Sequence, residues 1–164
     1  TPCPSPGTHS RTWKWKLKKM SKVVVFDRDG LPVASARPVS VVLEPEVVLE
    51  DAGDTPAAKK IAELLVQHGS ADALAIRFPK FTDGRGFSLA ARLREAGYQG
   101  ELHAMGGIFP DLVFQLRRVG FTHFHLENPG VERIERHVLE PFGGYYQAAP
   151  DGSRAPWQEQ LAEA

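Results

Sequence analysis

One ten-residue stretch, PKFTDGRGFS at 79–88, gathers charged, small and hydroxyl side chains between an apolar run and a helical pattern. Lysine and arginine supply positive charge in such a loop, and glycine lets the backbone approach a ligand closely. Unpaired N–H groups at the start of a helix also attract anions. These residue types predict a site for an oxyanion such as phosphate. The residues expected to bind the anion are Lys80, Asp83, Gly84, Arg85, Gly86, Ser88 and Arg92.

The same loop has a simpler interpretation, in which Asp83 pairs with Arg85 and the segment is a capped, solvated turn. The stretch matches neither a Walker loop nor a dinucleotide-binding fingerprint. If the chain is an enzyme, we expect His103 or Asp111, near the same rim, to act as acid or base. Its substrate would then be a phosphorylated or sulfur-oxyanion small molecule.

Two histidines, His123 and His125, share one face of a predicted strand, which Glu127 continues, and His103 lies on the preceding strand. Imidazole and carboxylate at this spacing can bind zinc or iron. A polar strand face, or core histidines paired with the backbone, is the more common reason for such a pattern. We therefore predict no metal site and keep His123 and His125 as weak candidates.

A second acidic pattern, Asp27 and Asp29 in DRDG, follows the predicted strand 22–26. Phosphatases of the haloacid dehalogenase class place a carboxylate nucleophile and a second acid in this way, with Mg²⁺ between them. The downstream hydroxyl, lysine and acidic pair of that class cannot be placed in this sequence. DRDG is also an ordinary turn, and this is the interpretation that we favour.

Alternating helical and strand patterns must position these residues. Apolar runs predict strands at 22–26, in one or two pieces within 39–49, and at 73–78, 101–105 and 122–127. Helical spacing predicts helices at 56–68, 88–97, 110–120 and 131–142. In helix 88–97, Leu89 and Leu93 form the apolar face, whereas Arg92 and Arg94 are expected to point outward. The alternation predicts an α/β domain with a mostly parallel sheet and flanking helices, either Rossmann-like or a partial barrel.

The chain length of 164 residues favours a single domain, flanked by two segments of different composition. Residues 1–19 combine proline, glycine and serine with five basic and no acidic residues, and we expect a disordered basic extension there. Residues 20–150 form the predicted α/β domain, and 151–164 are expected to be an irregular tail.

Charge and cysteine content narrow the class of protein. Beyond residue 19 the chain has 15 basic and 20 acidic residues, which argues against nucleic-acid binding by the fold itself. Cys3 is the only cysteine, so a disulfide within the chain is impossible and a reducing compartment is favoured. No apolar run reaches transmembrane length. We expect a cytoplasmic protein.

Residues 73–126 resemble the bacterial DUF934 family, most specifically in FPKFTDGRGFSLAARLRE, with support from GEL at 100–102 and RRVGF at 117–121. Members are described as oxidoreductases or accessory proteins of assimilatory sulfite reduction, and their genes lie beside those of sulfate assimilation. The resemblance implies a role next to sulfite reductase or another enzyme of that pathway, and it leaves open whether this chain catalyses a reaction.

The chain departs from the family pattern at three positions. Gly107 and Leu112 stand where the family has an acid and an amide, and Val119 stands where it often has cysteine. No cysteine cluster, flavin motif or nicotinamide motif is visible, so no cofactor is evident. If the protein serves sulfite reduction, we expect it not to carry the electrons itself.

Overall fold

The computed structural model describes residues 23–34, 37–46, 57–127, 129–142, 145–150, 152 and 155–162. The predicted basic extension at 1–19 lies outside the described residues, as do Thr55 and Pro56 at the predicted start of a helix.

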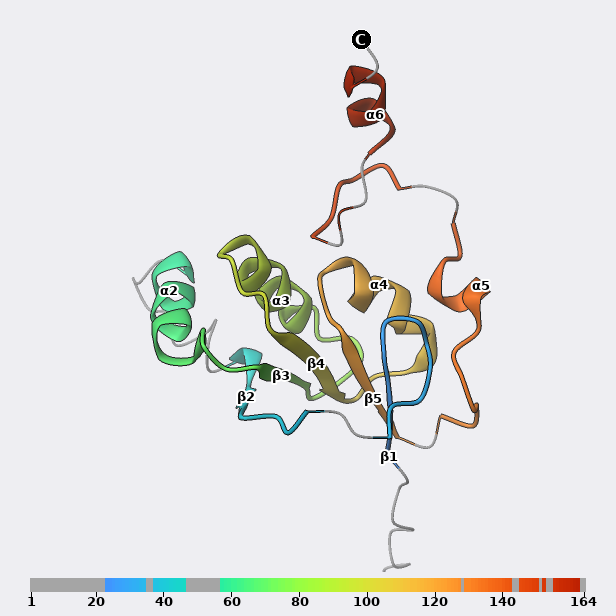
Figure 1. Cartoon of the computed structure of the whole chain (residues 1–164), viewed down its shortest axis with the longest axis horizontal. Coiled ribbons are helices and arrows are strands. Elements are labelled where there is room, and N and C mark those ends of the chain that lie inside the picture. Colours follow the sequence, from blue (N-terminus) through green and yellow to red (C-terminus); the bar gives the residue numbers. More distant parts are fainter. Residues whose placement is uncertain are drawn as a thin grey trace, which may run out of the picture.

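Five strands form one sheet in the order β1-β5-β4-β3-β2 (Figure 1). The strands are β1 (Val23–Phe26), β2 (Val41–Leu43), β3 (Ala73–Phe78), β4 (Glu101–Gly106) and β5 (His123–Glu127). Strands β2 to β5 are parallel, whereas β1 runs antiparallel along β5 at the sheet edge. The prediction of a mostly parallel α/β sheet is therefore confirmed.

Successive parallel strands lie side by side, so every crossover steps in the same direction across the sheet. Right-handed crossovers of this kind place their helices on the same face. Figure 1 shows α2 (Ala57–His68), α3 (Arg85–Glu95) and α4 (Val113–Arg118) on one side of the strands. Of the two arrangements left open by the sequence, this is the one-sided winding of a partial barrel. We call the opposite side of the sheet the far face.

Strand alternation divides the side chains between the two faces. On the helix side, the strands and helices share one apolar core, to which β3, α3, β4, α4 and β5 contribute Leu74, Ile76, Phe78, Leu89, Leu93, Leu102, Leu116, Phe124 and Leu126. Pairing in register places Ala75, His103 and His123 in one row on the far face. The far face thus carries polar side chains where the helix side carries the core.

Several predicted helices differ from those observed. Helix α3 starts at Arg85, so Ser88 lies inside it and does not cap it. The pattern at 110–120 splits into a 3-10 turn, η1 (Pro110–Leu112), and the short α4. The pattern at 131–142 contains only α5 (Arg136–Leu139), because Ile134 is buried in a loop and its N–H bonds to the Gly30 carbonyl. Within the tail expected to be irregular, α6 is helical over Pro156–Ala162.

Two arginines of α4 bind later segments of the chain. Arg117 donates from Nη1 to the carbonyl of Leu139 at 3.1 Å. Arg118 donates from Nη2 to the Gln147 carbonyl at 2.6 Å, and its guanidinium lies 3.8 Å from the centre of the Tyr145 ring. These contacts hold the end of α5 and the segment after it against α4.

Candidate functional site

The loop between β3 and α3 is organised by an ion pair between Asp83 and Arg85. Arg85 donates from Nε and Nη2 to the two carboxylate oxygens of Asp83 at 2.9 and 2.8 Å. Its backbone N–H also donates to Asp83 Oδ1 at 3.1 Å, and Nη2 reaches Glu46 Oε1 at 2.7 Å. A protein carboxylate therefore lies at the start of α3, where an anion was expected. This is the pairing of the capped-turn interpretation, and anion binding by Arg85 remains a prediction.

The Arg85 side chain lowers the pKa of Asp83, chiefly through its hydrogen bond, with the backbone N–H of Arg85 contributing further. Because the folded-state pKa lies below that of the unfolded chain, the pair stabilises the fold above about pH 4 and this stability is lost as the pH falls through the folded pKa. As the pH falls from 5 until Asp83 is protonated, the free energy of unfolding should decrease by about 1 kcal/mol more in wild type than in Asp83→Asn. Urea unfolding at a series of pH values measures this difference.

The matched control for this pH dependence is Asp29→Asn, because the carboxylate of Asp29 makes no hydrogen bond or ion pair within the described part of the chain. Because the substitution breaks no contact of that carboxylate, its effect on the unfolding midpoint should be much smaller than that of Asp83→Asn. Parallel curves for wild type and Asp83→Asn would contradict the stabilising role of the pair.

The two glycines of the loop lie in different surroundings. Gly84 has φ −71° and needs no special backbone freedom. Gly86 is buried in the first turn of α3, and a Cβ there would lie 2.4 and 2.5 Å from the Phe78 ring. Gly86 thus lets α3 approach β3 closely, instead of exposing backbone to a ligand.

We expect Gly86→Ala to destabilise the fold by about 1–3 kcal/mol, because the methyl group overpacks the core at Phe78. Gly84→Ala is the control, since nothing lies within 4 Å of a Cβ at that position. That control should be neutral or slightly stabilising. Chemical denaturation of both variants distinguishes them, and equal midpoints would show that the loop moves to accommodate the methyl group.

The remaining predicted anion ligands are dispersed. Ser88 and Arg92 line a groove on the outer side of α3, together with Ala58 and Ile61 of α2. His103 lies within β4 on the far face, so its expected position at the rim with Asp111 is wrong. Asp111 is exposed in η1, which follows β4 at the carboxyl ends of the strands, and Lys80 is exposed in the loop after β3.

An exposed pair of phenylalanines marks these carboxyl ends. Phe81 and Phe109 are 54% and 52% exposed, and their rings meet edge to face at 5.6 Å. Their loops are pressed together at Gly107, where a Cβ would lie 3.2 Å from Lys80 Cα. We call Lys80, Phe81, Gly107 and Phe109 the aromatic rim. Beside it lies a pocket of about 410 Å³ lined by Arg77, Phe78, Pro79, Gly106, Gly107, Ile108, Phe109 and Glu127.

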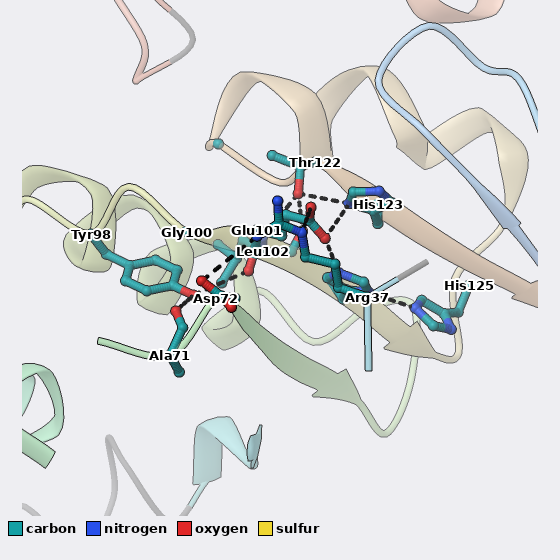
Figure 2. A network of polar contacts seen from close by, with 12 residues as sticks. Arg37, Ala71, Asp72, Tyr98, Gly100, Glu101, Leu102, Thr122, His123 and His125 are labelled. Carbon is teal, nitrogen blue, oxygen red and sulfur yellow. Dashed lines mark hydrogen bonds and ion pairs between the residues drawn. The ribbon is translucent and has the colours of Figure 1, made fainter. Parts of the chain in front are cut away.

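A second polar group, the histidine cluster of Glu101, His103, His123 and His125, occupies the far face by strand register. Figure 2 labels Glu101, His123 and His125 of this cluster. His103 is fully buried, and its Nδ1 lies 2.9 Å from His125 Nε2. Its Nε2 lies 3.3 Å from Glu101 Oε2, and the His123 ring stacks on it at 4.5 Å. Strand register therefore brings both weak metal candidates together with His103, and it adds Glu101, which sequence reasoning missed.

Burial and neighbouring imidazoles determine the charge of this cluster. The pKa of His125 falls to about 4, first through burial and then through His103 and His123. Burial, followed by the nearby His123, also lowers the pKa of His103, although Glu101 opposes the shift. Both rings are consequently neutral near pH 7, so each has one nitrogen that can accept a hydrogen bond or bind a cation.

Comparison with known protein families gives a match that covers most of the described fold. The family described as "Bacterial protein of unknown function (DUF934)" matches residues 54–157, which is more than half of the chain. The chain belongs to the DUF934 family. The match spans the loop after β3, the aromatic rim and the histidine cluster. No curated protein and no solved structure matches this DUF934 chain. Among the described residues, none of the helices has the length and apolar character needed to cross a membrane.

Proposed function

We propose that this DUF934 chain is an accessory protein of assimilatory sulfite reduction, and that it binds a partner protein through the aromatic rim. The observation that carries the binding role is the exposed pair Phe81–Phe109 at the carboxyl ends of the strands. Parallel sheets place their ligand-binding loops at this edge. Aromatic side chains are the groups most enriched at the centres of protein interfaces.

The ion pairs of Arg85 in the loop after β3 also favour a protein partner over a small anion. Asp83 and Glu46 already accept hydrogen bonds from Arg85, so an incoming oxyanion would have to compete with two carboxylates. Lys80 is exposed next to Phe81 and adds positive charge to the rim. An aromatic surface with adjacent positive charge suits an acidic protein surface with an apolar centre. The link to sulfite reduction itself comes from the family resemblance of residues 73–126.

The alternative function is an enzyme acting on a phosphorylated or sulfur-oxyanion small molecule. The pocket beside the rim favours it, since Arg77 and the backbone of Gly106 and Gly107 line the edge where such sheets bind ligands. This alternative predicts saturable binding of sulfite, sulfate or phosphate that Arg77→Ala, which removes the positive charge lining the pocket, abolishes. The accessory role predicts no such binding and a complex with sulfite reductase.

Growth of a deletion strain on single sulfur sources tests the proposed function. We expect failure on sulfate and on sulfite, with normal growth on sulfide, because the defect would lie at the reduction of sulfite. A plasmid copy of the gene should restore growth. Normal growth on all three sources, in a strain without a second copy, would overturn the link to sulfite reduction.

A further inference from the structure

The histidine cluster contains three donor atoms that lie close together on the far face. Glu101 and His103 come from β4, and His123 comes from the neighbouring strand β5. Glu101 Oε2 lies 3.3 Å from His103 Nε2 and 3.8 Å from His123 Nδ1. One ligand atom from each of the three residues lies within 4.8 Å of the other two.

These separations can be compared with those in metal sites. Zinc binds imidazole nitrogen and carboxylate oxygen at about 2.0–2.2 Å, so two donors of a tetrahedral site lie roughly 3.3–3.6 Å apart. The contact between His103 and Glu101 already has this length, and that between His123 and Glu101 needs a small contraction. Because the His123 ring is stacked on His103 with 17° between the ring planes, one of the two rings must also tilt for both nitrogens to face the same ion. The backbone register fixes the starting positions, because His103 and His123 are paired residues of adjacent strands.

The hydrogen-bond and ion-pair partners of the proposed ligands are also those expected around a bound metal ion. A histidine that binds a metal through one nitrogen usually donates its other N–H to an acceptor. His103 has such a partner, since its Nδ1 lies 2.9 Å from His125 Nε2 while Nε2 faces Glu101. Arg37 forms an ion pair with the second carboxylate oxygen, its Nε lying 3.1 Å from Glu101 Oε1, and leaves Oε2 for the cation (Figure 2).

Thr122 also approaches a proposed donor atom, from another side. Its hydroxyl lies 3.0 Å from His123 Nδ1. The same hydroxyl can donate to the Leu102 carbonyl at 3.2 Å, so its proton need not point at the imidazole. The side chains of His123 and Glu101 are 15% and 25% exposed, which gives a cation access to the buried His103 from their side.

We propose that Glu101, His103 and His123 form a mononuclear site for a divalent first-row transition metal, with His125 as the hydrogen-bond acceptor that orients His103. Two imidazoles and one carboxylate match the donor set of zinc and of non-haem iron(II) sites. Three protein ligands leave at least one coordination position for water or a small ligand. Oxygen-seeking Mg²⁺ should not bind.

Calorimetric titration of the metal-free full chain tests this site. The chain is titrated separately with Zn²⁺, with Fe²⁺ under anaerobic conditions, and with Mg²⁺. We expect one equivalent of Zn²⁺ or Fe²⁺ to bind, and Co²⁺ to give the visible absorption of a four- or five-coordinate site. Glu101→Gln and His123→Asn should each weaken binding by more than about 100-fold, whereas losing the acceptor in His125→Leu should cost about 10–100-fold. His125→Gln, which keeps an acceptor, should lose less than His125→Leu.

Controls separate this site from other metal ligands in the chain. His68→Asn and His137→Asn alter histidines of α2 and α5 and should bind Zn²⁺ as wild type does. A Cys3→Ser/His9→Asn variant should also bind normally, which excludes residues 1–19 as the source. Circular dichroism checks the fold of each variant, and His123→Asn decides the result if Glu101→Gln does not fold. Absence of stoichiometric binding in wild type, or unchanged binding in His123→Asn, would overturn the proposal.

Discussion

Arg94→Met is expected to lower the free energy of unfolding by about 3 kcal/mol. The Arg94 guanidinium donates four hydrogen bonds to three backbone carbonyls, those of Tyr98, Gly100 and Gly120, at 2.7–3.0 Å. Methionine fills a similar space but leaves these carbonyls without their donor. Each unsatisfied carbonyl should lower the free energy of unfolding by about 1 kcal/mol or more. Burial lowers the pKa of Arg94, because the charged guanidinium loses contact with water. This desolvation cost offsets part of the stabilisation that the four hydrogen bonds provide.

The environment of Gly120 shows how closely the chain surrounds this arginine. Gly120 has φ +100°, and a Cβ there would lie 2.5 Å from Arg94 Cγ. Through Arg94, the end of α3, the start of β4 and the turn before β5 are held together, so its loss should loosen three segments at once. A drop in the urea midpoint without a change in the slope of the transition is the expected signature.

Arg92→Met is the matched control for Arg94→Met, because Arg92 lies on the same helix and is exposed. Its unfolding free energy should stay within about 0.5 kcal/mol of wild type. Arg94→Lys should fall between the two, since an ammonium group cannot reproduce the planar fork of donors. Equal midpoints for Arg94→Met and Arg92→Met would show that water replaces the guanidinium at little cost.

The double variant Phe81→Ser/Phe109→Ser should lose binding to purified sulfite reductase by at least about 100-fold, since central aromatic residues contribute 2 kcal/mol or more each when truncated. Both rings are about half exposed, so the fold should keep most of its stability. Surface-immobilised sulfite reductase and soluble variant protein give the affinity directly. The same variant should fail to restore growth of the deletion strain on sulfite.

Tyr146→Ser provides the control for the aromatic rim, because Tyr146 is an aromatic residue that is 90% exposed and lies in the segment after α5. It should bind and restore growth as wild type does. If the double variant restores growth on sulfite, the rim is not the docking surface. If wild type binds sulfite or phosphate and not the reductase, the enzyme alternative is favoured.

Local sequence signals predicted the central strands well. Strand β3 was predicted with its observed ends, and β4 and β5 within one residue, because their apolar runs are bounded by proline, glycine or charged turns. The order of the strands required pairings between distant residues, which no local pattern contains. The one-sided winding and the existence of the far face were therefore undetermined until the structure placed them.

The main errors of the sequence analysis concerned the contacts of individual side chains. Helical spacing assigned Arg94 to the solvent face. Its long side chain instead extends past the end of α3 and donates to the carbonyls of Gly100 and Gly120. Glu101 was missed in the histidine cluster, although it is two residues from His103 and must share its strand face. Asp83 and Arg85 were correctly considered as a pair because they are near neighbours in the loop. The aromatic rim had no signal beyond two phenylalanines in glycine-containing loops.

The pairing of β1 with β5 has a consequence for the order in which the molecule can assemble. Each of the strands β2, β3 and β4 pairs with the next strand along the chain, so these contacts join segments separated by a single helical crossover. Val23 instead pairs with Glu127, across most of the described chain. Closing so long a loop costs more entropy and slows folding. During synthesis on the ribosome, the first strand must wait unpaired until the fifth has emerged, while the sheet between β2 and β4 can already exist.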